Sequence, residues 1–183
     1  MRPGADGWMK GVRKLASPNF DNRPRGIAPD LLVIHNISLP PGIFGGDAVI
    51  RLFCNTLDFD AHPYYAQLRG LRVSAHFLIR RDGEIIQLVS CDRRAWHAGA
   101  SSWQGRSRCN DFSIGVELEG CDAVPFDERQ YAALARLTRV LQRAYPLRQF
   151  AGHSDIAPQR KTDPGPCFDW PRYFALIRDK SIR

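Results

Sequence analysis

The 183-residue chain contains no long uninterrupted apolar segment. Its first residues, MRPGADGWMKGVRKL, lack the apolar stretch of a secretory signal. No later segment approaches the roughly 18 consecutive apolar residues that a membrane-spanning helix needs. We therefore expect a soluble, cytoplasmic protein with no membrane partner.

Cysteine pairs are absent as well. The five cysteines are an odd number, lie far apart and include no C-x-x-C pair, which argues against a disulfide framework and against a zinc ribbon. We expect reduced, mostly buried thiols at these positions. They are Cys54, Cys91, Cys109, Cys121 and Cys167.

The chain also lacks internal repeats, low-complexity tracts, linker-like boundaries and a glycine-rich phosphate loop. Its composition, 44% hydrophobic and 25% charged residues, is ordinary for one globular domain, which we place at residues 1–183. Lysine and arginine outnumber aspartate and glutamate by 26 to 19. The positive charge suits an anionic partner without identifying it.

Strand signals dominate the first part of the chain. The apolar run at residues 31–34 predicts a buried strand that ends on His35. Residues 73–79 and 84–89 predict a hairpin, because the Asp-Gly pair between them supplies the positive φ of a tight turn. The segment 36–72 is long and irregular, with a possible short helix near its middle, and such segments inside compact domains are often functional.

Helix signals follow in the last third. Asp127 and Gln130 form a capping box for a helix that Pro146 ends. A second helix is predicted at residues 169–177, after a strand-like pair at 150–151. Strands followed by helices predict an α/β protein of the α+β type, with a central mixed sheet flanked by helices.

Residues 111–120 predict a strand with an unusual polar face, because apolar and polar side chains alternate along it. The pattern leaves two interpretations of Glu117 open. It is a general base beside a catalytic metal, or it belongs to the solvent face of an edge strand. The polar face consists of Ser113, Gly115, Glu117 and Glu119.

The histidines are the first candidates for chemistry. His35 and His153 follow short apolar segments, which would hold each imidazole at the end of a rigid element. For His62 and His97, an ordinary surface or loop position is favoured over contact with a substrate, and for His76 a hydrogen-bonded core position is favoured. His35 and His153 are therefore candidate ligands, although a lone histidine is more often structural.

The segment GHSDIAPQRKTDPGP, residues 152–166, adds a carboxylate and a cation. Pro164 favours an extended conformation at Asp163, so Lys161 and Asp163 should leave the chain on the same side. Two histidines and a carboxylate form a known ligand set for catalytic zinc. A lysine beside such an ion makes sense where an oxyanion develops, and the alternative is a solvated Lys-Asp pair.

Five segments that span almost the whole chain in order carry a resemblance to a known family. They are VIHNIS (33–38), SAHFLIRRDGEIIQLV (74–89), RAWHAG (94–99), CNDFSIGVELEG (109–120) and GHSDIAPQRKTDPGPCFDW (152–170). Together they resemble the zinc-dependent N-acetylmuramoyl-L-alanine amidases, a family related to T7-type phage lysozyme and the peptidoglycan recognition proteins. The likeness is strongest to the cytoplasmic AmpD type, the 1,6-anhydro-N-acetylmuramoyl-L-alanine amidases of cell-wall recycling.

The resemblance implies one zinc ion held by His35, His153 and Asp163, with Glu117 as proton acceptor and Lys161 as stabiliser of the transition state. It implies a small muropeptide as substrate, cleaved at the amide between the lactyl group of the sugar and L-alanine. No nucleic acid or protein partner is implied. Implied substrate contacts are Asn36, Tyr64, Arg72, Trp96 and Arg108.

Three alternatives stay open. Cys167, four residues after Asp163, is a minor alternative ligand, because some relatives use a cysteine. A muropeptide-binding module or regulator would share the fold without turnover. A basic nucleic-acid binder with a structural zinc would explain the charge, but no single element interleaves aromatic and basic residues as such binders do.

Overall fold

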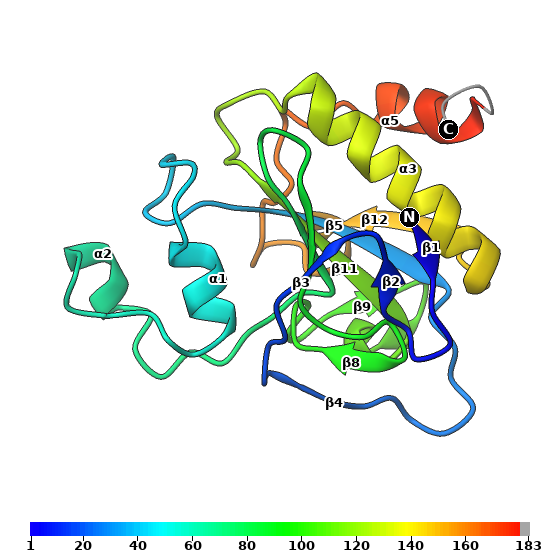
Figure 1. Cartoon of the computed structure of the whole chain (residues 1–183), viewed down its shortest axis with the longest axis horizontal. Coiled ribbons are helices and arrows are strands. Elements are labelled where there is room, and N and C mark those ends of the chain that lie inside the picture. Colours follow the sequence, from blue (N-terminus) through cyan, green and yellow to red (C-terminus); the bar gives the residue numbers. More distant parts are fainter. Residues whose placement is uncertain (180–183) are drawn as a thin grey trace.

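A six-stranded mixed β-sheet forms the centre of the computed structural model, which describes residues 1–179 (Figure 1). In spatial order its strands are β12 (Gln149–Gly152), β5 (Leu31–Ile37), β11 (Ser113–Glu119), β6 (Phe77–Ile79), β7 (Ile85–Gln87) and β3 (Arg13–Lys14). The first four strands run parallel to one another. β6 and β7 pair antiparallel, and β3 adds a short parallel edge. The predicted mixed sheet and its hairpin are confirmed.

The two central strands are buried on both faces. Leu32 and Ile34 of β5 pack with alternate residues of β11 in the largest apolar cluster. On the opposite face, His35 of β5 is the register partner of Glu117 in β11. The prediction that the first strand ends on His35 is wrong, because β11 pairs with β5 as far as Ile37.

Two helices lie side by side over one face of the sheet, α3 (Glu128–Ala144) and α5 (Trp170–Arg178) (Figure 1). The capping box predicted at Asp127 is present and begins α3. Asp169 caps α5 by accepting a hydrogen bond from the backbone of Arg172. Tyr173 of α5 is fully buried in the same apolar cluster, so both helices are fixed to the sheet by packing.

The segment 36–72 packs on the other face and carries two short helices, α1 (Ala48–Phe53) and α2 (Pro63–Ala66), which extend to one side of the molecule (Figure 1). Buried residues of α1 contact Leu78 and Ile86 of the hairpin. Leu78 pairs with Glu117, so this segment lies on the same face of the sheet as the candidate base.

Shorter elements complete the part of the chain that the structure describes. They are β1 (Arg2–Pro3), β2 (Met9–Lys10), β4 (Phe20–Asn22), β8 (Arg93–Ala95), β9 (Ser102–Trp103), β10 (Arg106–Ser107), the 3-10 turn η1 (Cys109–Asp111) and α4 (His153–Ile156). Within residues 1–179, no helix has the length and apolar character to cross a membrane.

All five cysteines are free thiols, as predicted. Cys91 and Cys109 are fully buried. The prediction of mostly buried thiols is wrong for the other three, which are partly exposed because they lie in loops or at a helix end.

Candidate active site

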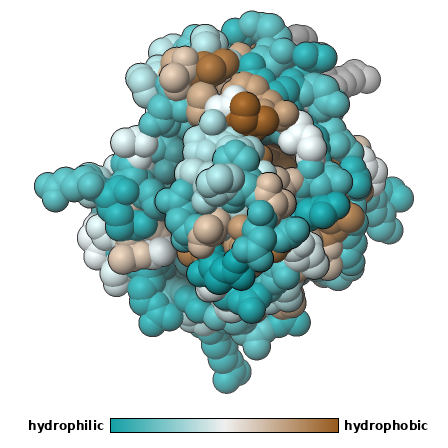
Figure 2. All heavy atoms as spheres, turned by 90° about the vertical axis from the view of Figure 1, so that its left-hand side faces the viewer, coloured by the Kyte–Doolittle hydropathy of each residue, from teal (hydrophilic) through white to brown (hydrophobic). Residues whose placement is uncertain are grey.

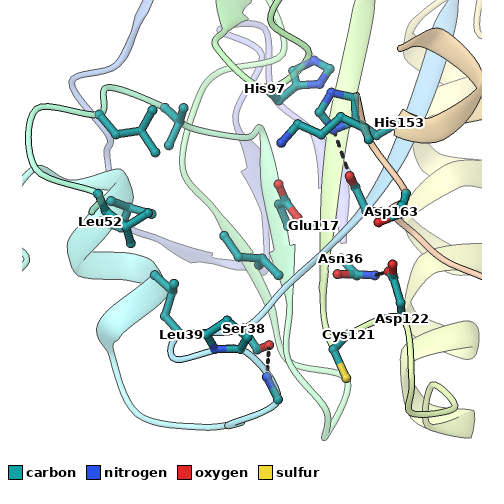
Figure 3. Close-up of a pocket in the computed structure, with 18 of the residues that line it drawn as sticks. Asn36, Ser38, Leu39, Leu52, His97, Glu117, Cys121, Asp122, His153 and Asp163 are labelled. Atoms are coloured by element: carbon teal, nitrogen blue, oxygen red, sulfur yellow. Dashed lines mark hydrogen bonds and ion pairs between the residues drawn. The ribbon is translucent and has the colours of Figure 1, made fainter. Parts of the chain in front are cut away.

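The three predicted metal ligands converge beside the carboxyl ends of β5 and β12. His153 directly follows β12 as the first residue of α4, and Asp163 lies on the loop after that helix. The Nδ1 atoms of His35 and His153 are 3.0 Å apart. The Asp163 Oδ2 atom is 2.9 Å from the first and 3.1 Å from the second. Figure 3 shows the Asp163 carboxylate directed at His153.

The outer ring nitrogens of the two histidines are also occupied. His153 Nε2 lies 3.1 Å from the carbonyl oxygen of Ala98, which only accepts hydrogen bonds. This nitrogen therefore carries a hydrogen, while Nδ1 of the same ring faces the Asp163 carboxylate. His35 Nε2 lies 2.9 Å from Nδ1 of His97. Metal-binding histidines usually have such an outer partner.

Burial and mutual contact shape the charge of this group. Burial lowers the pKa of His35 to about 4, although its hydrogen bond with Asp163 acts in the opposite direction. Burial raises the pKa of Asp163, but hydrogen bonds with His153 and His35 outweigh that effect and bring it below its usual 3.8. At neutral pH the site thus has a carboxylate and an uncharged His35, the forms that bind metal ions.

The donor set fits a metal ion. The three ligand atoms form the one group of this kind among residues 1–179, and the two histidines are buried. Two imidazole nitrogens and one carboxylate oxygen are a set found in catalytic zinc sites, which leave a fourth position for water. Cys167, the alternative ligand, is not a member of the group.

Glu117 lies next to His35 across the β5–β11 pair. Its side chain is buried, and its Oε2 atom has no hydrogen-bond partner within the described chain. Burial raises the pKa of Glu117 well above its ordinary 4.5, the negative charge of Asp163 raises it further, and Lys161 opposes both. The interpretation of Glu117 as part of a solvent-facing edge strand is wrong, because β11 is central in the sheet.

Lys161 is exposed and lines the same cavity as Glu117 and Asp163. Its positive charge lowers the pKa of Glu117. Lys161 and Asp163 are predicted to leave the chain on the same side, and both line this cavity. An ammonium group at this place faces whatever enters the cavity.

The cavity has a volume of about 770 Å³ and joins two different walls. One wall is polar and contains His153, Asp163 and Glu117, as Figure 3 shows. The other is apolar and belongs to the segment 36–72 and the residues after it. Figure 2 views the molecule from the side of α1 and α2, where the surface is mostly hydrophilic with small apolar patches. The apolar wall includes Leu39, Leu52, Phe53, Leu68, Leu71 and Val73.

The comparison with known proteins agrees with this geometry. Residues 25–166 match the family described as N-acetylmuramoyl-L-alanine amidase. The chain belongs to this amidase family. It is 58% identical, over 93% of its length and 92% of the relative's, to the 1,6-anhydro-N-acetylmuramyl-L-alanine amidase AmpD of Salmonella typhimurium strain SL1344. Identity to the same enzyme of Escherichia coli K12 is 57%, over 93% and 94% of the two chains.

Solved structures give the same result for the fold. A crystal structure of an AmpD selenomethionine derivative superposes with a TM-score of 0.94 at 56% identity, covering 97% of this chain and 99% of the other. A second structure is E. coli AmiD in complex with the substrate anhydro-N-acetylmuramic acid-L-Ala-D-gamma-Glu-L-Lys. Its TM-score is 0.59 at 32% identity, over 85% of this chain and 60% of that one.

The residues predicted to contact substrate divide into two groups in this amidase. Asn36 and Tyr64 line the cavity. Arg72, Trp96 and Arg108 do not. Both of these arginines are exposed, and Nε of Arg108 lies 3.2 Å from an Asp111 carboxylate oxygen. The structure therefore brings only two of the five to the cavity that His153 and Asp163 line.

The Asn36 side chain has a structural role besides its place in the cavity. Its amide nitrogen donates to the Asp122 carboxylate at 2.7 Å and to the Pro164 carbonyl at 3.0 Å. Figure 3 shows Asn36 and Asp122 facing each other below Asp163. Asn36 thus links the end of β5 to the turn that carries Asp163, and only its amide oxygen is left for a ligand.

Sequence reasoning missed several contributors to this amidase site. Arg160 donates to the carbonyl oxygens of Ala98 and Ala100 at 2.8 and 2.7 Å, which holds their loop against the candidate ligands. His97, read as an ordinary loop histidine, contacts His35. Asp155, to which no role had been given, accepts a hydrogen bond from Gly152 N and so caps α4.

The other two histidines lie away from the candidate ligands. His76 is a buried, hydrogen-bonded core residue, as predicted: its Nδ1 accepts from Gly115 N at 3.0 Å. His62 is exposed and caps α2 by accepting from the backbone of Tyr64. Only spatial contacts separate His62 from His97, because the sequence places both in loops.

Proposed function

We propose that this chain is a single-domain, zinc-dependent amidase, spanning residues 1–183 and acting on muropeptides in the cytoplasm during peptidoglycan recycling. It hydrolyses the amide between the lactyl group of 1,6-anhydro-N-acetylmuramic acid and L-alanine. The names of its relatives support this substrate. The observation that carries the proposal is the convergence of His35, His153 and Asp163 beside the unpartnered carboxylate of Glu117.

The two histidines and Asp163 would hold the zinc ion. When bound, zinc supplies a Lewis acid for the scissile carbonyl and lowers the pKa of a water molecule toward about 7. The hydrogen bond from His153 to Ala98 and the contact of His35 with His97 keep both Nδ1 atoms aimed at one point. This chain therefore provides the orientation of the ligands before any substrate enters.

Glu117 takes the proton from the attacking water. Its unpartnered Oε2 atom and its raised pKa suit a group that must accept a proton and then release it. Water oxygen adds to the carbonyl carbon, the carbon–nitrogen bond breaks, and Glu117 passes the proton to the departing alanine nitrogen. The products are the sugar with a free lactyl carboxylate and the peptide with a free amino terminus.

Lys161 stabilises the oxyanion that forms on the carbonyl oxygen. A positive charge placed where negative charge develops lowers the barrier more than it favours the uncharged substrate. The exposed position of Lys161 on the cavity allows its ammonium to reach a bound substrate.

Substrate recognition divides between the two walls of the cavity. Asn36 and Tyr64 contact the part of the substrate nearest the scissile bond, because they line the cavity itself. Arg72, Trp96 and Arg108 contact groups that extend out of it, and the two guanidinium groups suit the carboxylates of the peptide.

The proposal is tested by incubating the protein with an anhydromuramoyl tripeptide and measuring release of an alanine amino terminus. Release should stop with a chelator and return with added zinc. Absence of release from zinc-loaded protein would contradict the proposal. Tight binding of the tripeptide without release would indicate a non-catalytic muropeptide-binding module of the same fold.

A further inference from the structure

His97 is a buried side chain that contacts the candidate ligand His35 without belonging to the ligand group itself. It lies between β8 and β9 and is only 8% exposed. One ring nitrogen, Nδ1, is 2.9 Å from Nε2 of His35. The other, Nε2, is 3.1 Å from the Ser113 hydroxyl at the start of β11. A chain of three side chains thus leads from the ligand site into the sheet.

The sheet has space for this ring because position 115 carries no side chain. A Cβ atom on Gly115 would lie 2.4 Å from Cγ and 2.6 Å from Nδ1 of His97, which is closer than real atoms approach. Glycine in the interior of a strand weakens it and often marks a close approach. Ser113 and Gly115 share one face of β11, so one residue contacts the ring and the other makes room for it.

The hydrogen atoms of this chain have two consistent arrangements, because a neutral imidazole has one N–H and one lone pair. In the first, His35 donates from Nε2 to His97, and His97 donates from Nε2 to the oxygen of Ser113. The lone pair of His35 Nδ1 then faces Asp163 and the metal position. In the second, all donors are reversed, and the hydrogen on His35 Nδ1 blocks ligation.

We propose that His97 is a positioning residue that holds His35 in the form with its hydrogen on Nε2, and that Ser113 is the final acceptor of this chain. The proposal rests on the metal site of the proposed function. The Ala98 carbonyl does the same for His153. Residues 97 and 98, adjacent in sequence, therefore orient both imidazole ligands.

Two substitutions of His97 separate hydrogen bonding from packing. In His97→Asn, the amide oxygen can take the place of Nδ1 and accept from His35. His97→Leu fills a similar volume and cannot accept. Zinc affinity, measured by competition with a chromophoric chelator, should fall about 10- to 100-fold in the leucine variant, the size of effect typical of outer-shell partners. The asparagine variant should stay close to the unsubstituted protein.

Thermal unfolding of both metal-free variants provides the control for folding. Equal zinc affinity in the leucine and asparagine variants, whether reduced or not, would overturn the proposal. Failure of the unsubstituted protein to bind zinc would instead contradict the proposed function. The two failures are therefore distinguishable without measuring activity.

A measurement on the unsubstituted protein removes any dependence on variants. Nitrogen-15 NMR of the histidine rings in the zinc-loaded protein reports which nitrogen carries the hydrogen. We expect His35 and His97 both to carry it on Nε2. A hydrogen on Nδ1 of His97 would overturn the proposal even if the leucine variant does not fold.

Discussion

Glu117 and Glu119 are two residues apart on the same face of β11, and both are buried, at 8% and 5% exposure. Their surroundings differ completely. Glu119 accepts hydrogen bonds from the backbone of Gly45 at 2.6 Å and of Arg81 at 3.0 Å. Glu117 has a buried oxygen without any partner in the described chain. One strand therefore carries a carboxylate bound by the backbone and a carboxylate with a buried oxygen left without a partner in the described chain.

The difference arises from what each glutamate faces. Glu119 lies near the end of β11, where it joins the loop at Gly45 to the hairpin turn at Arg81. Glu117 faces the cavity and the candidate ligands. A buried polar group without a partner costs stability, so folds tolerate it mainly where function requires it.

The largest expected effect is on turnover. Glu117→Gln should lower kcat about 10²- to 10⁴-fold, because the general base is lost while the shape of the side chain is kept. Zinc content should be unchanged, as determined by metal analysis. Glu119→Gln is the matched control and should keep most of its activity. Similar losses in the two variants would erase the proposed distinction between the carboxylates.

Lys161 is a positively charged residue that lines the same cavity as Glu117. Lys161→Met should lower kcat about 10²- to 10³-fold, because the oxyanion loses its cationic partner. KM should change less than kcat in steady-state measurements with the anhydromuramoyl tripeptide. A change confined to KM would show that Lys161 binds the substrate without stabilising the transition state.

The substitution of Glu119, which should leave most of the activity, should lower stability. Glu119→Gln should lower the free energy of unfolding by about 1–3 kcal/mol, because its amide group would meet the N–H of Gly45 or Arg81 instead of accepting from both. Urea unfolding of the metal-free protein measures this. A fully stable Glu119→Gln variant would mean that the two backbone hydrogen bonds contribute little.

The smallest effect concerns pH. The pKa of Glu117 is raised in the folded protein, so its contribution to stability is present below about 4.5 and is lost as pH rises through the folded value. The metal-free Glu117→Gln variant has no carboxyl group to titrate at this position. Its free energy of unfolding should therefore become larger than that of the metal-free unsubstituted protein as pH rises above about 4.5. Urea unfolding across pH 4 to 8 tests this, and a constant difference between the two proteins would contradict it.

Local chemistry explains which parts of the fold could be predicted. The Asp127 capping box, the Asp-Gly turn and the alternation of residues 111–120 each depend on neighbours in sequence, and all three are confirmed. The end of β5 could not be predicted from its own residues, because its last pairs depend on β11. The sequence also could not show that Glu119 is bonded and Glu117 is not.

The residues of the candidate site divide in the same way, into those that neighbours in sequence could indicate and those that only contacts in the fold reveal. His35, His153 and Asp163 could be grouped because both histidines come after short apolar stretches in the sequence and Asp163 lies in a proline-restricted loop. His97 could not be recognised, since its partners lie 62 and 16 positions away in the sequence. Arg72, among the predicted substrate contacts, lies on an exposed loop, whose path sequence patterns do not determine.

The pairing of β5 with β11 has a consequence for where the sequence of such a protein can gain or lose residues. His35 and Glu117 are register partners in the centre of the sheet, so the spacing between the candidate ligand and the candidate base is set by backbone hydrogen bonds of two neighbouring strands. Beyond Ile37, the segment that forms the apolar wall takes no part in that pairing. Insertions or deletions in this segment can therefore alter which molecules fit the cavity while the reacting groups keep their separation.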